Sequence, residues 1–531
     1  MESVDTPEDD PSSALAPGRI GAAFVAVLGL AAAVPIVTAV TLLPSALATG
    51  AGPLVPLAFV AVAVILVLFC TGYAAMARRS PSAGAAYAYV ARGLGRPAGL
   101  AAGWLAVAGY QAIQFGLYVL AGVAAAPLLR SWFGITAPWW AVAAACWAFV
   151  ALCGTMRLEV AAGVLALLAG AEAAVLAGLA AANVIEPYAG RVTTESITIT
   201  DLGAVDRPTL GLLLAGGLLA FAGFETTGTY AEEALRPRRT TALAGCGAVV
   251  LIVLLLGGLA WSMIVAAGPG SITSRAGAGG VELIFDLADD RLAPWAVTLT
   301  RLMWFGGVVA GLLALHLPIA RYLFAMGRER VLPGVLGHTG RRTGAPRAAS
   351  LTQSLIAGAA LAGAWAAGAD PGPATARWLL IGGALSILVL FVITSLAALL
   401  HLNRVPGPES AWARFIAPVL STVSLASLAW LALRDLPALL DLPAGYALVR
   451  AVPAALAGCL LLGLLHAAAL RRVNPVAYAG IGLDGVAVVI TPQSPAEPGP
   501  SPDPPLIPRQ RTPGAHRPER IQVSQRSPGP E

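Results

Sequence analysis

Three ionisable residues stand inside long apolar stretches of this sequence. Glu225 lies in LLAFAGFETTGTYAEE, between Gly223 and Gly228, while Glu172 lies in LLAGAEAAVLAG and His316 in GVVAGLLALHLPIARY. An ionised carboxylate in the middle of a bilayer costs about 2.5–3.5 kcal/mol on insertion scales, so it persists only beside a wet cavity or a partner. A carboxyl or imidazole group in such a cavity can take up and release a proton. The three residues are therefore candidates for proton coupling.

Each candidate also has a purely structural interpretation. Glu172 could equally well form a hydrogen bond to a neighbouring helix. A lone histidine inside a membrane is more often a packing residue with a satisfied ring. Glu225 is the strongest candidate, because packing does not explain a carboxylate at that position.

The composition places all three residues in a membrane protein. Of the 531 residues 57% are hydrophobic and only 11% are charged, whereas soluble domains carry about 25% charged residues. This excludes a soluble enzyme, a nucleic-acid binder and a disordered protein. Twelve apolar segments are each long enough to cross about 30 Å of hydrocarbon as a helix, and no alternating barrel pattern is present. The sequence predicts an all-α integral membrane protein with 12 transmembrane helices.

Two of these predicted helices are interrupted. Pro35 stands in the middle of the first, where it removes a donor and clashes with the preceding turn, and Gly223 and Gly228 bracket Glu225 in the sixth. Breaks five helices apart fit an inverted repeat of five plus five helices, with a site where the breaks meet. We expect the first repeat at about 20–184, the second at about 208–402, and helices 11 and 12 at about 412–470.

The arginine distribution gives an orientation. All 33 basic residues are arginine, and about twofold more of them fall in connections on the side of the N-terminus than on the other side. We therefore expect a multi-pass protein of the cell membrane with both termini in the cytoplasm. Residues 1–18 should be a disordered acidic tail, 19–473 the twelve-helix domain, and 474–531 a disordered Pro-rich tail.

Three segments resemble the amino acid–polyamine–organocation superfamily of permeases. They are SAGAAYAYVARGLGRPAG (82–99), FAGFETTGTYAEEALRPRRT (221–240) and ARYLFAMGRERVLPGVLG (320–337). The resemblance covers the chain from Arg19 to about Asp484. It implies alternating access, in which the repeats move around a site at the middle of the membrane.

The resemblance also assigns roles at that site. It implies that backbone amides around Ala32, Ala33 and Val34 bind a substrate carboxylate. The amine would be bound by Gly223, Phe224 and Glu225, with Phe224 as a lid. The remaining candidate lining residues are Pro35, Thr226 and Tyr110. Because the first break reads AAAVP and Pro35 offers no N–H to an anion, amines and polyamines remain alternatives to an amino acid.

The eighth helix favours a proton as coupling ion. A sodium site would need oxygen ligands, and this helix has neither Ser nor Thr in its inner half. At the cytoplasmic end, Glu232, Glu233 and Arg236 are candidates for a gate. The sequence gives no reason to expect a metal, a cofactor or nucleic acid.

The predicted function is a secondary transporter for an amino acid or related amine, driven by protons and embedded in lipid. An exchanger without proton coupling and a permease-like sensor that moves nothing remain alternatives. A membrane-embedded enzyme is disfavoured, because neither HExxH nor GxSxG occurs.

Overall fold

The computed structural model describes residues 14–193, 205–340 and 343–484. Within these ranges the chain is helical, and its only β-type pairing is an isolated bridge between Ile20 and Ala234. The helices are α1 (Ala22–Ala32), α2 (Pro35–Thr41), α3 (Leu43–Leu47), α4 (Val55–Arg79), α5 (Ala86–Leu94), α6 (Arg96–Phe133), α7 (Trp139–Gly154), α8 (Leu158–Ile185), α9 (Arg207–Leu219), α10 (Pro237–Ile252), α11 (Gly258–Ala267), α12 (Ile272–Gly279), α13 (Leu283–Asp289), α14 (Pro294–Arg328), α15 (Arg347–Ala366), α16 (Pro373–Arg404), α17 (Ala417–Arg434), α18 (Leu436–Leu440), α19 (Ala447–Val473) and α20 (Pro475–Gly480).

Ten helical segments of the described chain are long and apolar enough to cross a membrane. They are Ala22–Thr41, Gly52–Arg79, Arg96–Phe133, Leu158–Ile185, Arg207–Tyr230, Arg238–Ala267, Pro294–Arg328, Pro373–Arg404, Trp412–Arg434 and Ala447–Val473. The other two segments predicted to cross correspond to α7, which has 16 residues, and α15. The multi-pass helical class is thus confirmed, whereas the count of twelve and the repeat symmetry stay predictions.

The first spanning segment is interrupted between α1 and α2. Val34 adopts a left-handed conformation (φ 49°, ψ 60°), and Pro35 begins the second helix. Proline suits a first helical position, because its missing N–H would have no helical partner there and its φ is already set. Its position therefore ends one helix and starts another.

The spanning segment Arg207–Tyr230 is interrupted as well. The α-helix α9 ends at Leu219, and the chain continues through a turn into the 3₁₀ helix η3 (Phe224–Tyr230). Gly223 lies between them with φ +119°, a conformation that L side chains rarely adopt.

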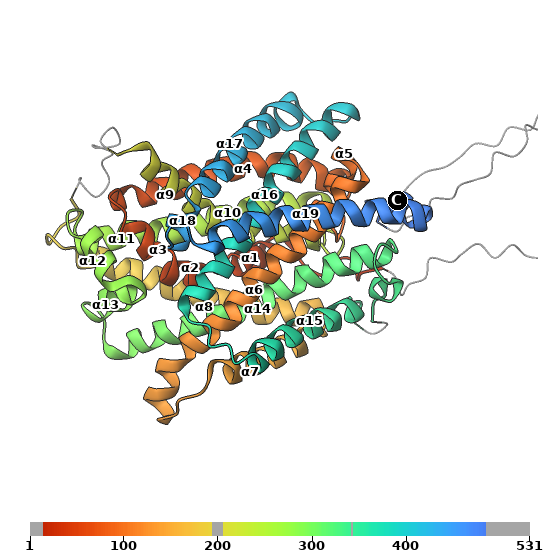
Figure 1. Ribbon diagram of the computed structural model, residues 1–531. Helices are drawn as coiled ribbons and strands as arrows, with labels where there is room; N and C mark the ends of the chain where they lie inside the picture. Colours follow the sequence, from red (N-terminus) through yellow and green to blue (C-terminus); the bar gives the residue numbers. More distant parts are fainter. Residues whose placement is uncertain (1–13, 194–204, 341–342, 485–531) are drawn as a thin grey trace, which may run out of the picture. The chain divides into compact units, whose positions relative to one another are not determined.

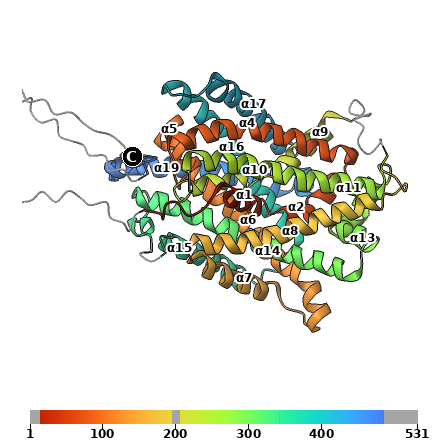
Figure 2. The ribbon, with the colours of Figure 1, turned by 180° about the vertical axis from the view of Figure 1, so that it is seen from behind.

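The long helices α6, α14 and α16 form the framework around these interruptions. α6 packs against α14, α16 and α19 (Figure 1). α1 contacts α8, α10, α14 and η3, and α8 and α14 run side by side in the view of Figure 2. The interrupted segments are therefore enclosed by helices rather than facing lipid.

The expected tail boundaries need correction. Leu15 is buried, and residues 475–480 form α20, after which Ile481 is buried too. Leu15, Ala477 and Ile481 therefore pack against the bundle, because it can bury their apolar side chains. The remaining residues of the two predicted tails, 1–13 and 485–531, lie outside the described residues.

Candidate functional site

The two interruptions touch each other. Gly223 packs so closely on the end of α1 that a Cβ at residue 223 would lie 2.4 Å from the carbonyl oxygen of Ala32 and 2.8 Å from the nitrogen of Ala33. Only a glycine permits this approach. Candidates that lie 190 residues apart in the sequence are thereby brought together.

Glu225 lies directly beside this contact and points into the protein. Its side chain is 3% exposed. Oε1 accepts a hydrogen bond from the Tyr110 hydroxyl at 2.7 Å, and Oε2 accepts one from the Gly223 amide at 2.9 Å. The Tyr73 hydroxyl donates to the Glu225 carbonyl at 3.1 Å. The carboxyl group is thus held by donors from α6 and from its own interruption.

Two other residues of η3 have internal partners. Phe224 packs against the rings of Phe69 on α4 (6.1 Å between centroids) and Phe391 on α16 (5.4 Å). The Thr226 hydroxyl donates to the Gly223 carbonyl at 2.7 Å. Phe224 therefore forms part of an aromatic cluster at the site, and Thr226 stabilises the interruption.

Glu172 of α8 binds the other interruption. Its Oε1 accepts a hydrogen bond from the amide of Ile36, in the first turn of α2, at 2.5 Å. Its side chain is 2% exposed, and Oε2 has no hydrogen-bond partner in the described part of the chain. An amide that could bind a carboxylate of a substrate is therefore taken by a carboxylate of the protein itself.

His316 belongs to a different contact. Its Nε2 lies 2.9 Å from the hydroxyl of Ser350 on α15, and the ring packs against Gly154 of α7. No hydrogen bond joins it to Glu225 or Glu172 among the described residues. This geometry is that of a packing residue that links three helices.

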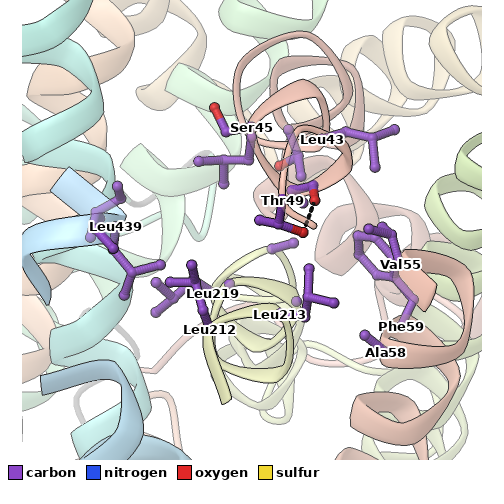
Figure 3. A pocket seen from close by; sticks show the side chains of 18 of the residues that line it. Leu43, Ser45, Thr49, Val55, Ala58, Phe59, Leu212, Leu213, Leu219 and Leu439 are labelled. Atoms are coloured by element: carbon purple, nitrogen blue, oxygen red, sulfur yellow. Dashed lines mark hydrogen bonds between the residues drawn. The ribbon is translucent and has the colours of Figure 1, made fainter. Parts of the chain in front are cut away.

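A series of cavities leads to the first interruption from the end of the bundle that carries Ser45 and Arg377. The three cavities measure about 90, 40 and 320 Å³, and all are lined by Leu42. The first has a mostly apolar lining from α3, α4, α9 and α18, to which Ser45 and Thr49 add hydroxyl groups (Figure 3). The smallest is lined by Ala32, Ala33 and Val34. We call this end the vestibule end.

The opposite end is closed by ion pairs, and we call it the gate end. Glu233 accepts hydrogen bonds from Arg321 of α14 at 2.7 and 3.0 Å, and both side chains are 2% exposed. Glu232 accepts from Arg328 at 2.7 and 2.9 Å and from the Ala83 amide at 2.7 Å. Charged bidentate pairs of this kind are among the strong hydrogen bonds of proteins.

The gate end corrects one predicted residue. Arg236 is exposed and pairs with neither glutamate, because residues 231–236 form a turn rather than a helix that would bring it back to them. Their partners are Arg321 and Arg328, which the sequence interpretation counted only as topology signals.

Comparison with known proteins agrees with this geometry. Residues 21–442 match the amino acid permease family, a member of the amino acid–polyamine–organocation superfamily. The chain belongs to the amino acid permease family. An uncharacterized transporter of Mycobacterium bovis is 28% identical over 353 residues, which cover 64% of this chain and 73% of the relative. Uncharacterized transporters of two Mycobacterium tuberculosis strains match over the same length at the same identity.

Membership of the permease family confirms the resemblance and makes the chain a membrane transporter. Two glutamines of α6 bond neighbouring helices. Gln111 and Gln114 both pair with Gln353 of α15, at 2.7–2.9 Å, and Gln114 also donates to the carbonyl of Leu312. Tyr73, which holds the η3 backbone, carried no sequence signal.

Proposed function

We propose that this permease is a secondary active transporter that moves an amino acid or related amine across the cell membrane with a proton. The observation that carries the proposal is the position of Glu225, a buried carboxyl group at the point where two helix interruptions meet. In this proposal Glu225 exchanges a proton as the site passes from one face of the membrane to the other.

The arrangement of the two ends supports alternating access. Cavities reach the interruption at Ala32–Val34 from the vestibule end, while paired arginines and glutamates close the gate end. The arginine distribution favours a cytoplasmic location for the gate end and both termini. In this proposal the arrangement corresponds to a state closed toward the cytoplasm, and the twelve helices and two inverted five-helix repeats stay part of the proposal.

One contact favours an amine without a carboxylate as substrate. The Ile36 amide in the first turn of α2 donates to Glu172 rather than remaining open to a bound anion, and Pro35 has no N–H to donate. A substrate carboxylate would have to displace a buried carboxylate of the protein. A decarboxylated amino acid or another organic amine avoids that competition, and Glu172 is then the second candidate for proton exchange.

A thermal-shift screen of the purified protein identifies the ligand. The probes are the proteinogenic amino acids and a set of amines that includes tyramine, putrescine and spermidine. A ligand at about 100 times its Kd stabilises the folded state by ~2.7 kcal/mol, which gives a measurable rise in melting temperature. Stabilisation by none of these compounds would contradict the proposed substrate class.

Transport by proteoliposomes then distinguishes the mechanisms. With the ligand from the screen, we expect accumulation that follows an imposed pH gradient and is unchanged when sodium is replaced by choline. Uptake that requires internal solute and moves no protons would indicate an exchanger. Binding without any uptake would indicate a sensor.

A further inference from the structure

A short segment at the end of the described chain is bound into the gate end. It comprises residues Ile481–Asp484, which follow α20, and we call it the strap. Ile481 is buried. Gly482 has φ +79°, and a Cβ at this position would lie 2.5 Å from the Cβ of Ala91 on α5. The strap is thus seated closely against α5.

Glu329, directly after α14, binds the strap backbone. Its carboxylate accepts hydrogen bonds from the amide of Gly482 at 3.1 Å and from that of Asp484 at 2.8 Å. The same carboxylate accepts the hydroxyl of Tyr87 on α5. One buried side chain therefore joins the end of α14, the strap and α5.

The side chain of Asp484 joins the strap to arginines. Arg92 donates to its carboxylate at 2.7 Å and to the Gly482 carbonyl at 2.9 Å. The carboxylate also accepts the hydroxyl of Ser82 and lies 3.7 Å from Arg328. Every donor around Asp484 thus comes from α14, from α5 or from the turn before α5.

The contacts of the strap involve Arg328, which binds Glu232, and the residue next to Ala83, whose amide also binds Glu232. Glu232 is held by Arg328 and by the amide of Ala83. The strap binds the same Arg328 and Ser82, the neighbour of Ala83. The strap therefore contacts one partner of Glu232 directly and the residue next to the other partner.

We propose that residues 481–484 are a strap that holds the gate end shut by ordering the partners of Glu232. Preorganised partners make a charged hydrogen bond stronger, because less side-chain freedom is lost when it forms. Release of the strap therefore shifts the protein toward the state with an open gate end. The proposal rests on the proposed function only in requiring that this end opens during the cycle.

Cysteine alkylation at the gate end tests the proposal without any substrate. Ala234 is 2% exposed and lies at the bridge to Ile20, so A234C becomes reactive only when this end opens. In a background whose five native cysteines are replaced by alanine, the maleimide reaction rate of A234C is compared with and without D484A. We expect D484A, and independently G482A, to raise the rate roughly tenfold, the effect of losing one charged hydrogen bond.

The control is D441A at the vestibule end. It removes the acid of the Arg377–Asp441 ion pair, and the Asp441 side chain is 84% exposed. It should leave the rate unchanged. Equal rates for D484A, G482A and the intact strap would overturn the proposal. Because the assay needs neither substrate nor proton gradient, failure of the transport experiments would not affect it.

Hydrogen–deuterium exchange distinguishes a strap that holds the gate end shut from a segment that only packs on the surface. In D484A we expect faster exchange in residues 481–484 and also in residues 228–236, where nothing has been substituted. Faster exchange confined to residues 481–484 would show that the segment only packs on the surface, and would contradict the proposal.

Discussion

Gly223 and Ala32 join the two interrupted spans of this permease. A Cβ at residue 223 would lie 2.4 Å from the Ala32 carbonyl oxygen, closer than real Cβ contacts come. The contact fixes Glu225, two residues further on, beside the end of α1. The properties of the site therefore depend on a glycine that bears no chemistry of its own.

Gly223→Ala should damage both folding and transport. The added methyl group collides with rigid backbone, and φ +119° strains any L side chain, so we expect a loss of about 1–3 kcal/mol in unfolding free energy. Thermal denaturation of the purified protein measures the change. The matched control is Gly178→Ala on α8, where nothing lies within 4 Å. A melting temperature of Gly223→Ala equal to that of the control would contradict the tight contact.

Glu172→Ala should change substrate preference. Removal of the carboxylate frees the Ile36 amide, so a ligand with a carboxylate should gain affinity over its decarboxylated counterpart by roughly tenfold. Competition between tyrosine and tyramine in the thermal-shift assay measures the ratio. Glu172→Gln keeps an acceptor for the amide and should leave the ratio near that of the parent protein. An unchanged ratio in Glu172→Ala would contradict our account of the contact.

Arg321→Met should destabilise the protein by about 3–5 kcal/mol, because it leaves the buried Glu233 carboxylate without its partner. Adding Glu233→Leu should recover part of the loss, since the uncompensated charge is then gone. Unfolding of both variants in the same detergent gives the two values. A double variant no more stable than Arg321→Met would show that the pair is not coupled in this way.

Strap release should depend on pH. Burial raises the pKa of Glu329 to about 7, despite the hydrogen bonds it accepts from Tyr87 and the strap amides. Burial also raises the pKa of Asp484, although Ser82, Arg92 and Arg328 lower it. When the strap leaves and water reaches both groups, their pKa values fall toward the ordinary range. The strapped state thus binds more protons, and it is favoured as pH falls through 7.

The A234C alkylation rate measures this dependence. In the strapped state Glu329 faces Asp484 and Arg328, and Asp484 faces Arg92, Arg328 and Glu232. At each pH the rate is divided by the rate of the same protein carrying Glu329→Gln, which corrects for ionisation of the thiol. This ratio should rise between pH 6 and pH 8. A ratio that falls over this interval would reverse the sign and contradict the linkage.

The membrane class, the family and the positions of both interruptions could be predicted from the sequence. Pro35 and the glycines around Glu225 are local signals, because proline and glycine act on the backbone where they stand. The partners of Glu232 and Glu233 were not predictable, since Arg321 and Arg328 lie about 90 residues away and their pairing depends on helix packing. The strap was missed for a similar reason. Its short sequence has no periodicity, and it is ordered by contacts with Glu329, Arg92 and Ser82, which lie far away in the sequence.

The most direct test of the central claim is proton movement by the Glu225→Gln variant. Proteoliposomes containing a pH-sensitive dye and the ligand identified by thermal shift report proton entry and solute uptake together. We expect the parent protein to take up both. Glu225→Gln should still bind the ligand but move no protons and accumulate nothing against a gradient. Proton-driven accumulation by Glu225→Gln at the parental level would show that this carboxyl group does not couple transport to protons.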